Sequence, residues 1–115
     1  RVSLLTDFQK ELNPFVQDPK EFDMGAIKNI LKSVGFNDLN ILGENIQLSK
    51  TNSIKESIYK DSQIKGVNFG KLMQFLRISL VGDLSGPDVF FIIKIVGKDV
   101  TLRRLNSLIE KIQKQ

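Results

Sequence analysis

The clearest apolar pattern in the chain lies between residues 68 and 82. Its positions follow the i, i+3, i+4, i+7, i+11 spacing of one face of an α-helix. They are Phe69, Leu72, Met73, Leu76 and Leu80. A second stripe, of Gly70, Gln74, Arg77 and Val81, follows spacings of four, three and four, which places Gln74 and Arg77 side by side on the helix surface.

A second amphipathic helix is predicted over residues 98–113. Its apolar positions are again spaced by three and four residues; they are Leu102, Leu105, Ile109 and Ile112. Arg103, Arg104 and Lys111 are expected elsewhere on its surface.

The first half of the chain predicts shorter helices. Residues 1–10 are expected to form a short helix, and the Asn-Pro and Asp-Pro pairs at 13–14 and 18–19 break it. Asp23 can cap the next helix, which Gly35 is expected to stop.

Two further helices are expected before residue 67. The first covers 37–50 and carries apolar residues at Leu39, Leu42, Ile46 and Leu48. The second starts at Thr51 or Ser53 and ends at Gly66. Its predicted apolar face consists of Ile54, Ile58 and Ile64.

The local sequence of residues 82–96 is compatible with either a strand or a helix. Ser85 followed three residues later by Asp88 fits a capping box, and Pro87 suits a first helical turn. The next eight residues, VFFIIKIV, are mostly β-branched or aromatic, which favours a strand.

The amino-acid composition limits the kinds of functional site that the chain can form. The 115 residues are 41% hydrophobic, which suits one compact domain or two small subdomains. The absence of cysteine and histidine excludes disulfides, a thiolate nucleophile, the commonest general base and the commonest zinc ligand. A carboxylate magnesium site or a lysine nucleophile stays possible, although no residues cluster to suggest one. The start RVSLLTDFQK shows no signal peptide, so we interpret the chain as a fragment of a longer cytoplasmic protein.

Charge is unevenly distributed. The net charge is +4, and all of it falls in residues 71–115, which hold eight Lys/Arg and four Asp/Glu. Such a basic segment suits a polyanionic partner, but a lysine-rich solvated helix face has the same charge.

A set of residues at nearly fixed spacing runs through the stretch from residue 70 to residue 112: Gly70-Lys71, Leu76-Arg77, Leu80, Gly82, Pro87, Phe90, Gly97-Lys98, Leu102 and Arg104-Leu105. With these residues the stretch resembles the C-terminal end of bacterial and organellar glutamyl-tRNA synthetases. A weaker likeness at Arg1 to Leu5, Phe15 and Phe22-Asp23 extends it towards the start of the chain.

The resemblance implies an all-α fold, a cage of about six short helices that grips a tRNA anticodon loop. It decides residues 89–96 in favour of a helix. We expect an N-terminal helical subdomain at 1–66 and a three-helix subdomain at 67–115. The family's ATP-binding catalytic motifs are absent, so ATP and magnesium are implied only for the parent enzyme, and this fragment is expected to have no cofactor and no catalytic residue.

The positions that match the family's anticodon contacts are Gln74, Arg77, Gly86, Pro87 and Val89. An amide, a forked guanidinium, exposed backbone groups and an apolar wall suit the reading of unstacked bases. The family often has Thr or Ser at position 86, so a hydroxyl contact is lost here. Arg1 matches an arginine that contacts the third anticodon base.

Five basic residues are candidates for weaker phosphate contacts, which supply affinity without sequence information: Lys94, Lys98, Arg103, Arg104 and Lys111. Arg103 and Lys111, each taken singly, are better explained as solvated residues of the helix surface. The expected partner is glutamate tRNA, bound by a monomer, with neither DNA nor a membrane as partner.

Three alternatives stay open on the sequence. The chain could be a helical protein-interaction module with a basic face, or its last helix could bind a membrane surface. It could also use Asp83 and Asp88 as paired catalytic carboxylates, although Asp88 suits a helix cap better.

Overall fold

A computed structural model of the protein describes residues 18–114. Within this range it contains six α-helices, two short 3-10 helices and no strand. The elements are α2 (Met24–Leu31), η1 (Phe36–Leu39), α3 (Asn40–Leu48), η2 (Thr51–Ser53), α4 (Ile54–Lys65), α5 (Phe69–Val81), α6 (Val89–Val96) and α7 (Lys98–Gln113). The expected all-α fold is therefore confirmed, while the short helix expected at residues 1–10 lies outside the described residues.

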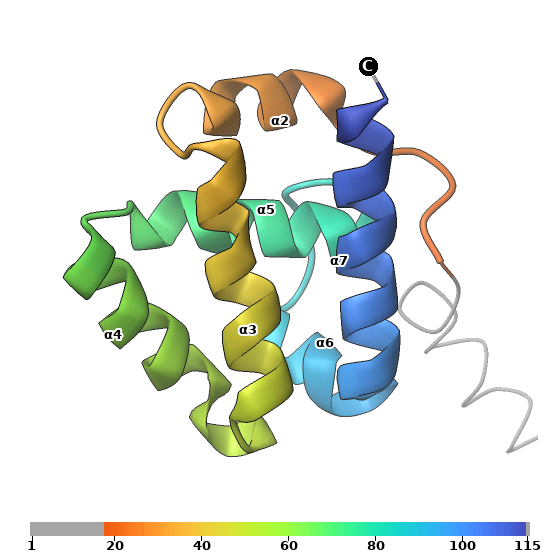
Figure 1. The fold of residues 1–115 in the computed structure, drawn as a ribbon. Helices are drawn as coiled ribbons and strands as arrows, with labels where there is room; N and C mark the ends of the chain where they lie inside the picture. Colours follow the sequence, from red (N-terminus) through yellow and green to blue (C-terminus); the bar gives the residue numbers. More distant parts are fainter. Residues whose placement is uncertain (1–17, 115) are drawn as a thin grey trace, which may run out of the picture.

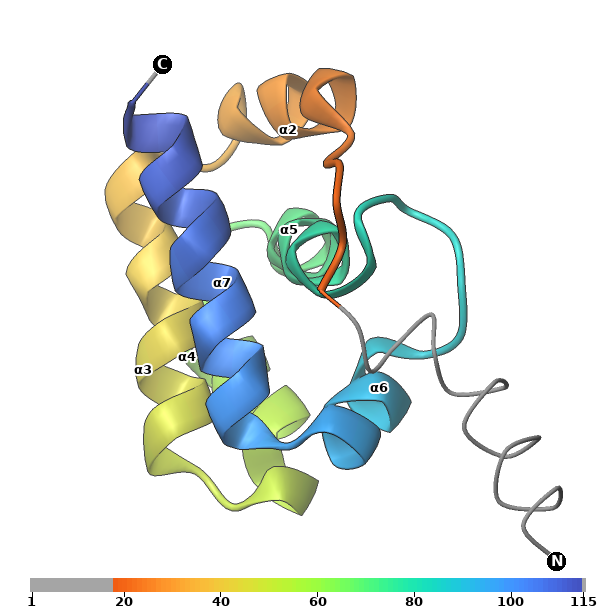
Figure 2. The ribbon, with the colours of Figure 1, turned by 90° about the vertical axis from the view of Figure 1, so that its right-hand side faces the viewer.

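Helix α5 is the centre of the molecule. It packs against α2, α4, α6 and α7, while α3 lies beside both α4 and α7. Figure 1 shows α3 and α7 side by side, with α5 crossing behind them and α2 across one end. The view in Figure 2 looks along α5 and shows α7 and α6 beside it.

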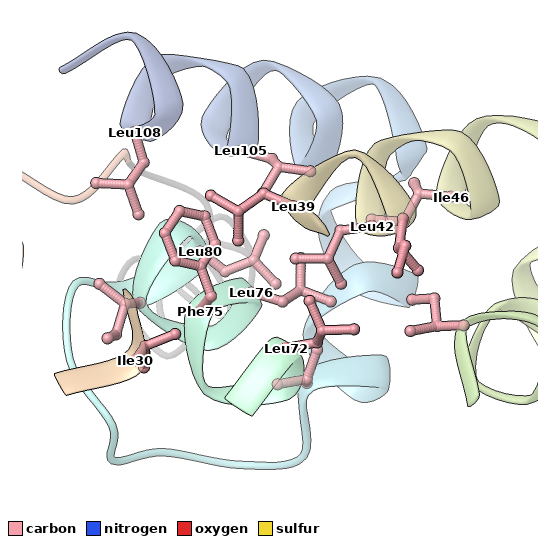
Figure 3. Packing of buried hydrophobic residues seen from close by; sticks show 14 of the residues in the cluster. Ile30, Leu39, Leu42, Ile46, Leu72, Phe75, Leu76, Leu80, Leu105 and Leu108 are labelled. Carbon is pink, nitrogen blue, oxygen red and sulfur yellow. The ribbon is translucent and has the colours of Figure 1, made fainter. Parts of the chain in front are cut away.

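One hydrophobic core joins these helices. Leu72, Phe75, Leu76 and Leu80 of α5 meet Leu105 and Leu108 of α7 and Leu39, Leu42 and Ile46 of η1 and α3 (Figure 3). The core thus draws on both sides of the subdomain boundary expected at residue 66, and the boundary itself stays a prediction.

Helix caps match the local sequence at several places. The Asp23 side chain accepts a hydrogen bond from Ala26 N at 3.0 Å and caps α2 as expected, although the helix ends at Leu31, before Gly35. Gly66 ends α4 and Gly82 ends α5, both in the left-handed region. The predicted helix at residues 98–113 coincides with α7.

Residues 89–96 form helix α6, which confirms the helix implied by the resemblance against the strand that local propensity favoured. The Asp88 carboxylate caps it by accepting hydrogen bonds from Phe90 N at 3.0 Å and Phe91 N at 3.3 Å. The expected capping box from Ser85, with Pro87 in the first turn, is wrong. Ser85 bonds Asp83 instead, because a carboxylate two residues upstream is within reach of both its N–H and its hydroxyl.

The apolar face expected for the helix before residue 66 is partly wrong. Ile54 and Ile58 are buried, but Ile64 is 82% exposed, and Ser62 takes the next buried position. Six residues after Ile58, the helix has turned Ile64 by about 120° away from the buried face. Leu48, at the end of α3, is exposed as well.

Candidate anticodon-loop site

Arg77 stands on α5 and reaches the loop that follows the helix. Its Nη1 donates a hydrogen bond to the carbonyl oxygen of Pro87 at 2.5 Å, and the carbonyl oxygen of Ser85 lies 3.5 Å away. The side chain is half-buried. Within residues 18–114, its Nε and Nη2 donate no hydrogen bond, so part of the guanidinium fork remains available to a ligand.

The loop at residues 82–88 has a defined shape. The Asp83 carboxylate accepts bonds from Ser85 N at 2.9 Å and Ser85 Oγ at 2.7 Å. These two bonds, with a smaller contribution from the nearby Arg77 charge, hold the pKa of Asp83 below its ordinary value. Gly86 has φ of 116°, in the region that favours glycine. The loop therefore presents a fixed backbone beside Arg77.

Gln74 and Pro87 lie at the edges of this arrangement. Gln74 is half-buried, three residues before Arg77 on the same helix, as the stripe predicted. Pro87 is half-buried and Gly86 exposed. Val89 is only 3% exposed and belongs to the core, so it offers little surface for the apolar wall expected there, and its contact with a base stays a prediction. Its burial follows from its place at the start of α6, a short helix whose buried residues are Val89, Ile92 and Ile93.

The predicted phosphate-contacting residues differ in their surroundings. Lys94 is exposed and Lys98 half-buried, and neither has an ion pair within residues 18–114. Arg103 pairs with Asp18, and this pairing lowers the pKa of the Asp18 carboxyl and raises that of Arg103. Lys111 has its ammonium 5.3 Å from the centre of the Phe22 ring.

Arg104 is not on the surface, contrary to expectation. It is 2% exposed, its Nε donates to Asp18 Oδ1 at 3.0 Å, and its Nη1 donates to the Leu80 carbonyl oxygen at 2.9 Å. A buried guanidinium needs such partners because its desolvation is costly. The sequence held one signal for its burial: Arg104 stands three residues after Thr101 and four before Leu108, on the face that α7 buries.

The chain matches one known protein family over almost its whole length. A family model described as an anticodon binding domain matches residues 1–109. The chain belongs to the anticodon-binding domain family.

Curated relatives of this anticodon-binding chain are glutamate–tRNA ligases. The enzyme of Christiangramia forsetii is 31% identical over 116 residues, which cover 98% of this chain and 23% of the relative. That of Flavobacterium johnsoniae is 36% identical over 111 residues, covering 94% and 21%. The chain thus spans less than a quarter of the length of these two relatives.

Solved structures agree with the helical architecture. A glutamate tRNA ligase from Elizabethkingia meningosepticum, crystallised with its amino acid, superposes with a TM-score of 0.76 at 37% identity, over 90% of this chain and 21% of that one. A glutamate–tRNA synthetase from Elizabethkingia anophelis gives a TM-score of 0.71, also at 37% identity, over 90% and 20%. The resemblance read from the sequence is confirmed.

The anticodon-binding chain brings together four of the six residues predicted to contact the anticodon. Gln74, Arg77, Gly86 and Pro87 lie on α5 and the loop after it, while Val89 is buried and Arg1 lies outside the described residues. The contacts that the sequence did not reveal are those of Arg77 with backbone carbonyls and of Arg104 with Asp18. Residues 18–114 hold no cluster of acidic side chains that could bind a metal ion, and none of their helices is long and apolar enough to cross a membrane.

Proposed function

We propose that this chain binds the anticodon loop of glutamate tRNA as the C-terminal region of a glutamate–tRNA ligase. The relatives' names support the proposal that the whole protein joins glutamate to tRNA. ATP and magnesium, in this proposal, are used by a region that this chain does not contain. We further propose that it acts as a cytoplasmic monomer. A general protein-interaction module is less favoured, because the matching family is named for anticodon binding.

The observation that carries the proposal is the tethered guanidinium of Arg77. Its bond to the Pro87 carbonyl holds one nitrogen of the planar fork, and Gln74 lies three residues earlier on the same helix, so the two residues are neighbours on the helix surface. Single-stranded RNA loops are read by hydrogen bonds to unstacked base edges, which need planar donors on a rigid frame. Helix α5, buried in the core on several sides, supplies that frame.

The basic residues have separate parts in this proposal. Lys94 and Lys98 can contact phosphates, which adds affinity that depends on salt but not on sequence. Arg103 and Lys111 could do so only by exchanging their contacts with Asp18 and Phe22. Arg104 is excluded from this group because it is buried.

The test is fluorescence anisotropy of the chain with glutamate tRNA and with the same tRNA changed at each anticodon base, at one fixed salt concentration. Arg77→Ala is expected to cost about 1–3 kcal/mol with the cognate tRNA and to relax selectivity at one base. Lys94→Ala, which removes the same charge, is expected to weaken the binding of all the tRNAs by the same factor.

Two results would contradict the proposal. The first is a wild-type chain that binds every anticodon variant alike. The second is an Arg77→Ala chain that loses no more affinity than Lys94→Ala and keeps the wild-type selectivity. In either case the basic segment would be a general polyanion surface.

A further inference from the structure

The buried arginine on α7 joins three parts of the chain. Arg104 has a side chain that is 1% exposed, and it binds both Asp18 and the carbonyl oxygen of Leu80. Leu80 lies in the last turn of α5, where carbonyl oxygens lack partners within the helix. A cation there also suits the negative end of the helix dipole. Arg104 therefore fixes the end of the helix that carries Arg77.

The segment at residues 18–23 is pressed against the same helix end. Asp23 N donates to the Gly82 carbonyl oxygen at 2.8 Å. A Cβ atom at Gly82 would lie 2.5 Å from the Glu21 carbonyl oxygen and 3.3 Å from Pro19 Cβ. Figure 2 shows this segment, in orange, crossing the end of α5 where the next loop leaves it.

Gly82 is also the first residue of the loop that Arg77 binds. The carbonyl groups of Ser85 and Pro87, three and five residues further on, are the acceptors for Arg77 Nη1. A displacement of the 18–23 segment or of the end of α5 would shift the start of this loop. The position of the Arg77 acceptors thus depends on the contacts made by Arg104.

We infer that Arg104, together with Asp18, is a positioning residue for RNA recognition by Arg77. It clamps the 18–23 segment to the end of α5 and thereby sets the geometry of the 82–88 loop. The inference rests on the proposed function, but it assigns Arg104 a part in base selectivity rather than in phosphate binding. It also makes the site sensitive to the segment that precedes α2.

The neighbouring arginine is a matched control. Arg103 binds the same carboxylate, but its side chain is 57% exposed and makes no bond to α5. Arg103→Gln and Arg104→Gln remove the same charge from adjacent positions. Any loss of general attraction to RNA should therefore be equal in the two variants.

The experiment compares the affinity of each folded variant for glutamate tRNA and for an anticodon-changed tRNA. Arg104→Gln is expected to lower the ratio of the two affinities about tenfold. Arg103→Gln is expected to weaken the binding of both tRNAs by the same factor and to leave the ratio of the two affinities unchanged. A purely structural role, which only lowers the folded fraction, would reduce both affinities by one factor and leave the ratio unchanged.

Asp18→Asn provides a second variant if Arg104→Gln does not fold. It raises the net charge by one, so electrostatics alone predicts tighter binding of both tRNAs, as in the control Glu44→Gln on the exposed face of α3. The positioning role predicts a lower ratio of the two affinities for Asp18→Asn and an unchanged ratio for Glu44→Gln. Amide hydrogen exchange should also become faster at Asp23 N and Ser85 N in Asp18→Asn and not in Glu44→Gln.

The results distinguish a failure of the positioning role of Arg104 from a failure of the proposed function. If the wild-type chain distinguishes the tRNAs but the folded Arg104 and Asp18 variants keep its ratio, the inference is wrong and the proposed function stands. If the wild-type chain binds both tRNAs alike, the proposed function is wrong, and with it the assignment of Arg104 to an RNA site.

Discussion

At the scale of single residues, Gly82 meets two demands at once. Its φ of 95° lies in the region that favours glycine, and the Glu21 carbonyl oxygen occupies the place that a Cβ atom would need. Gly66 has a φ of 69° but nothing within 4 Å of the position of a Cβ atom. A comparison of the two positions therefore separates the cost of a left-handed backbone from the cost of a close contact.

Substitution of these glycines by alanine should give unequal losses of stability. Gly66→Ala is expected to lower the free energy of unfolding by about 1–2 kcal/mol, the cost of a left-handed non-glycine residue. Gly82→Ala is expected to cost about 3 kcal/mol or more, because the 18–23 segment must also move. Urea unfolding followed by circular dichroism measures both, and equal losses would show that the contact with Glu21 is not limiting.

The sequence predicted residue neighbours along a helix but not their partners in space. The spacing of Gln74 and Arg77 placed them together on α5. The carbonyl groups that bind Arg77 belong to a loop whose path depends on Gly82, Gly86 and the 18–23 segment. The Asp18 partner of Arg104 lies 86 residues away in the chain, beyond the reach of any local pattern.

At the scale of elements, α6 shows how a cap and burial can override β-propensity. Its eight residues include Phe90, Phe91 and several β-branched side chains, yet the Asp88 carboxylate binds two of the N–H groups that open the helix. Its buried residues Val89, Ile92 and Ile93 follow helical spacing, so the helix can place all three in the core. Asp88 is thus a local residue that favours a helix here.

Removal of this cap should therefore destabilise the protein. Asp88→Ala is expected to lower the free energy of unfolding by about 1 kcal/mol, the usual cost of a lost N-cap. Asp83→Ala removes the same charge five residues earlier without uncapping a helix, and is expected to change stability by about 0.5 kcal/mol or less. Chemical denaturation of the two variants compares them directly, and a larger loss for Asp83→Ala would contradict the assigned cap.

At the scale of the whole molecule, the core does not follow the order of the chain. Leu42 of α3 and Leu76 of α5 lie on opposite sides of the predicted boundary at residue 66, yet both are fully buried in one cluster (Figure 3). Helix α3 also packs against α7, which begins nearly fifty residues after α3 ends. Two independently folding halves are not expected from this packing.

A single unfolding transition should follow. The chain has one tyrosine and no tryptophan, so tyrosine fluorescence reports on α4, where Tyr59 packs edge-on against Phe69, while circular dichroism reports on all the helices. The two signals are expected to change at the same urea concentration. Leu42→Ala and Leu76→Ala should each cost about 2–5 kcal/mol and shift both signals together. An earlier change in the tyrosine signal would support separate subdomains.

The sequence by itself determined the helical class of most segments, where several helices start and stop, and the basic bias of the last 45 residues. Helical spacing and caps such as Asp23, Gly66 and Gly82 are local properties, so they can be read from neighbouring residues. Local propensity left residues 89–96 open between strand and helix, and the tertiary structure has a helix there, as the resemblance implied. Only the tertiary structure showed that Arg104 and Val89 are buried and that Ile64 faces solvent. Local spacing sets the angle of a side chain around its helix. Which angle faces the core depends on helices that are distant in the chain.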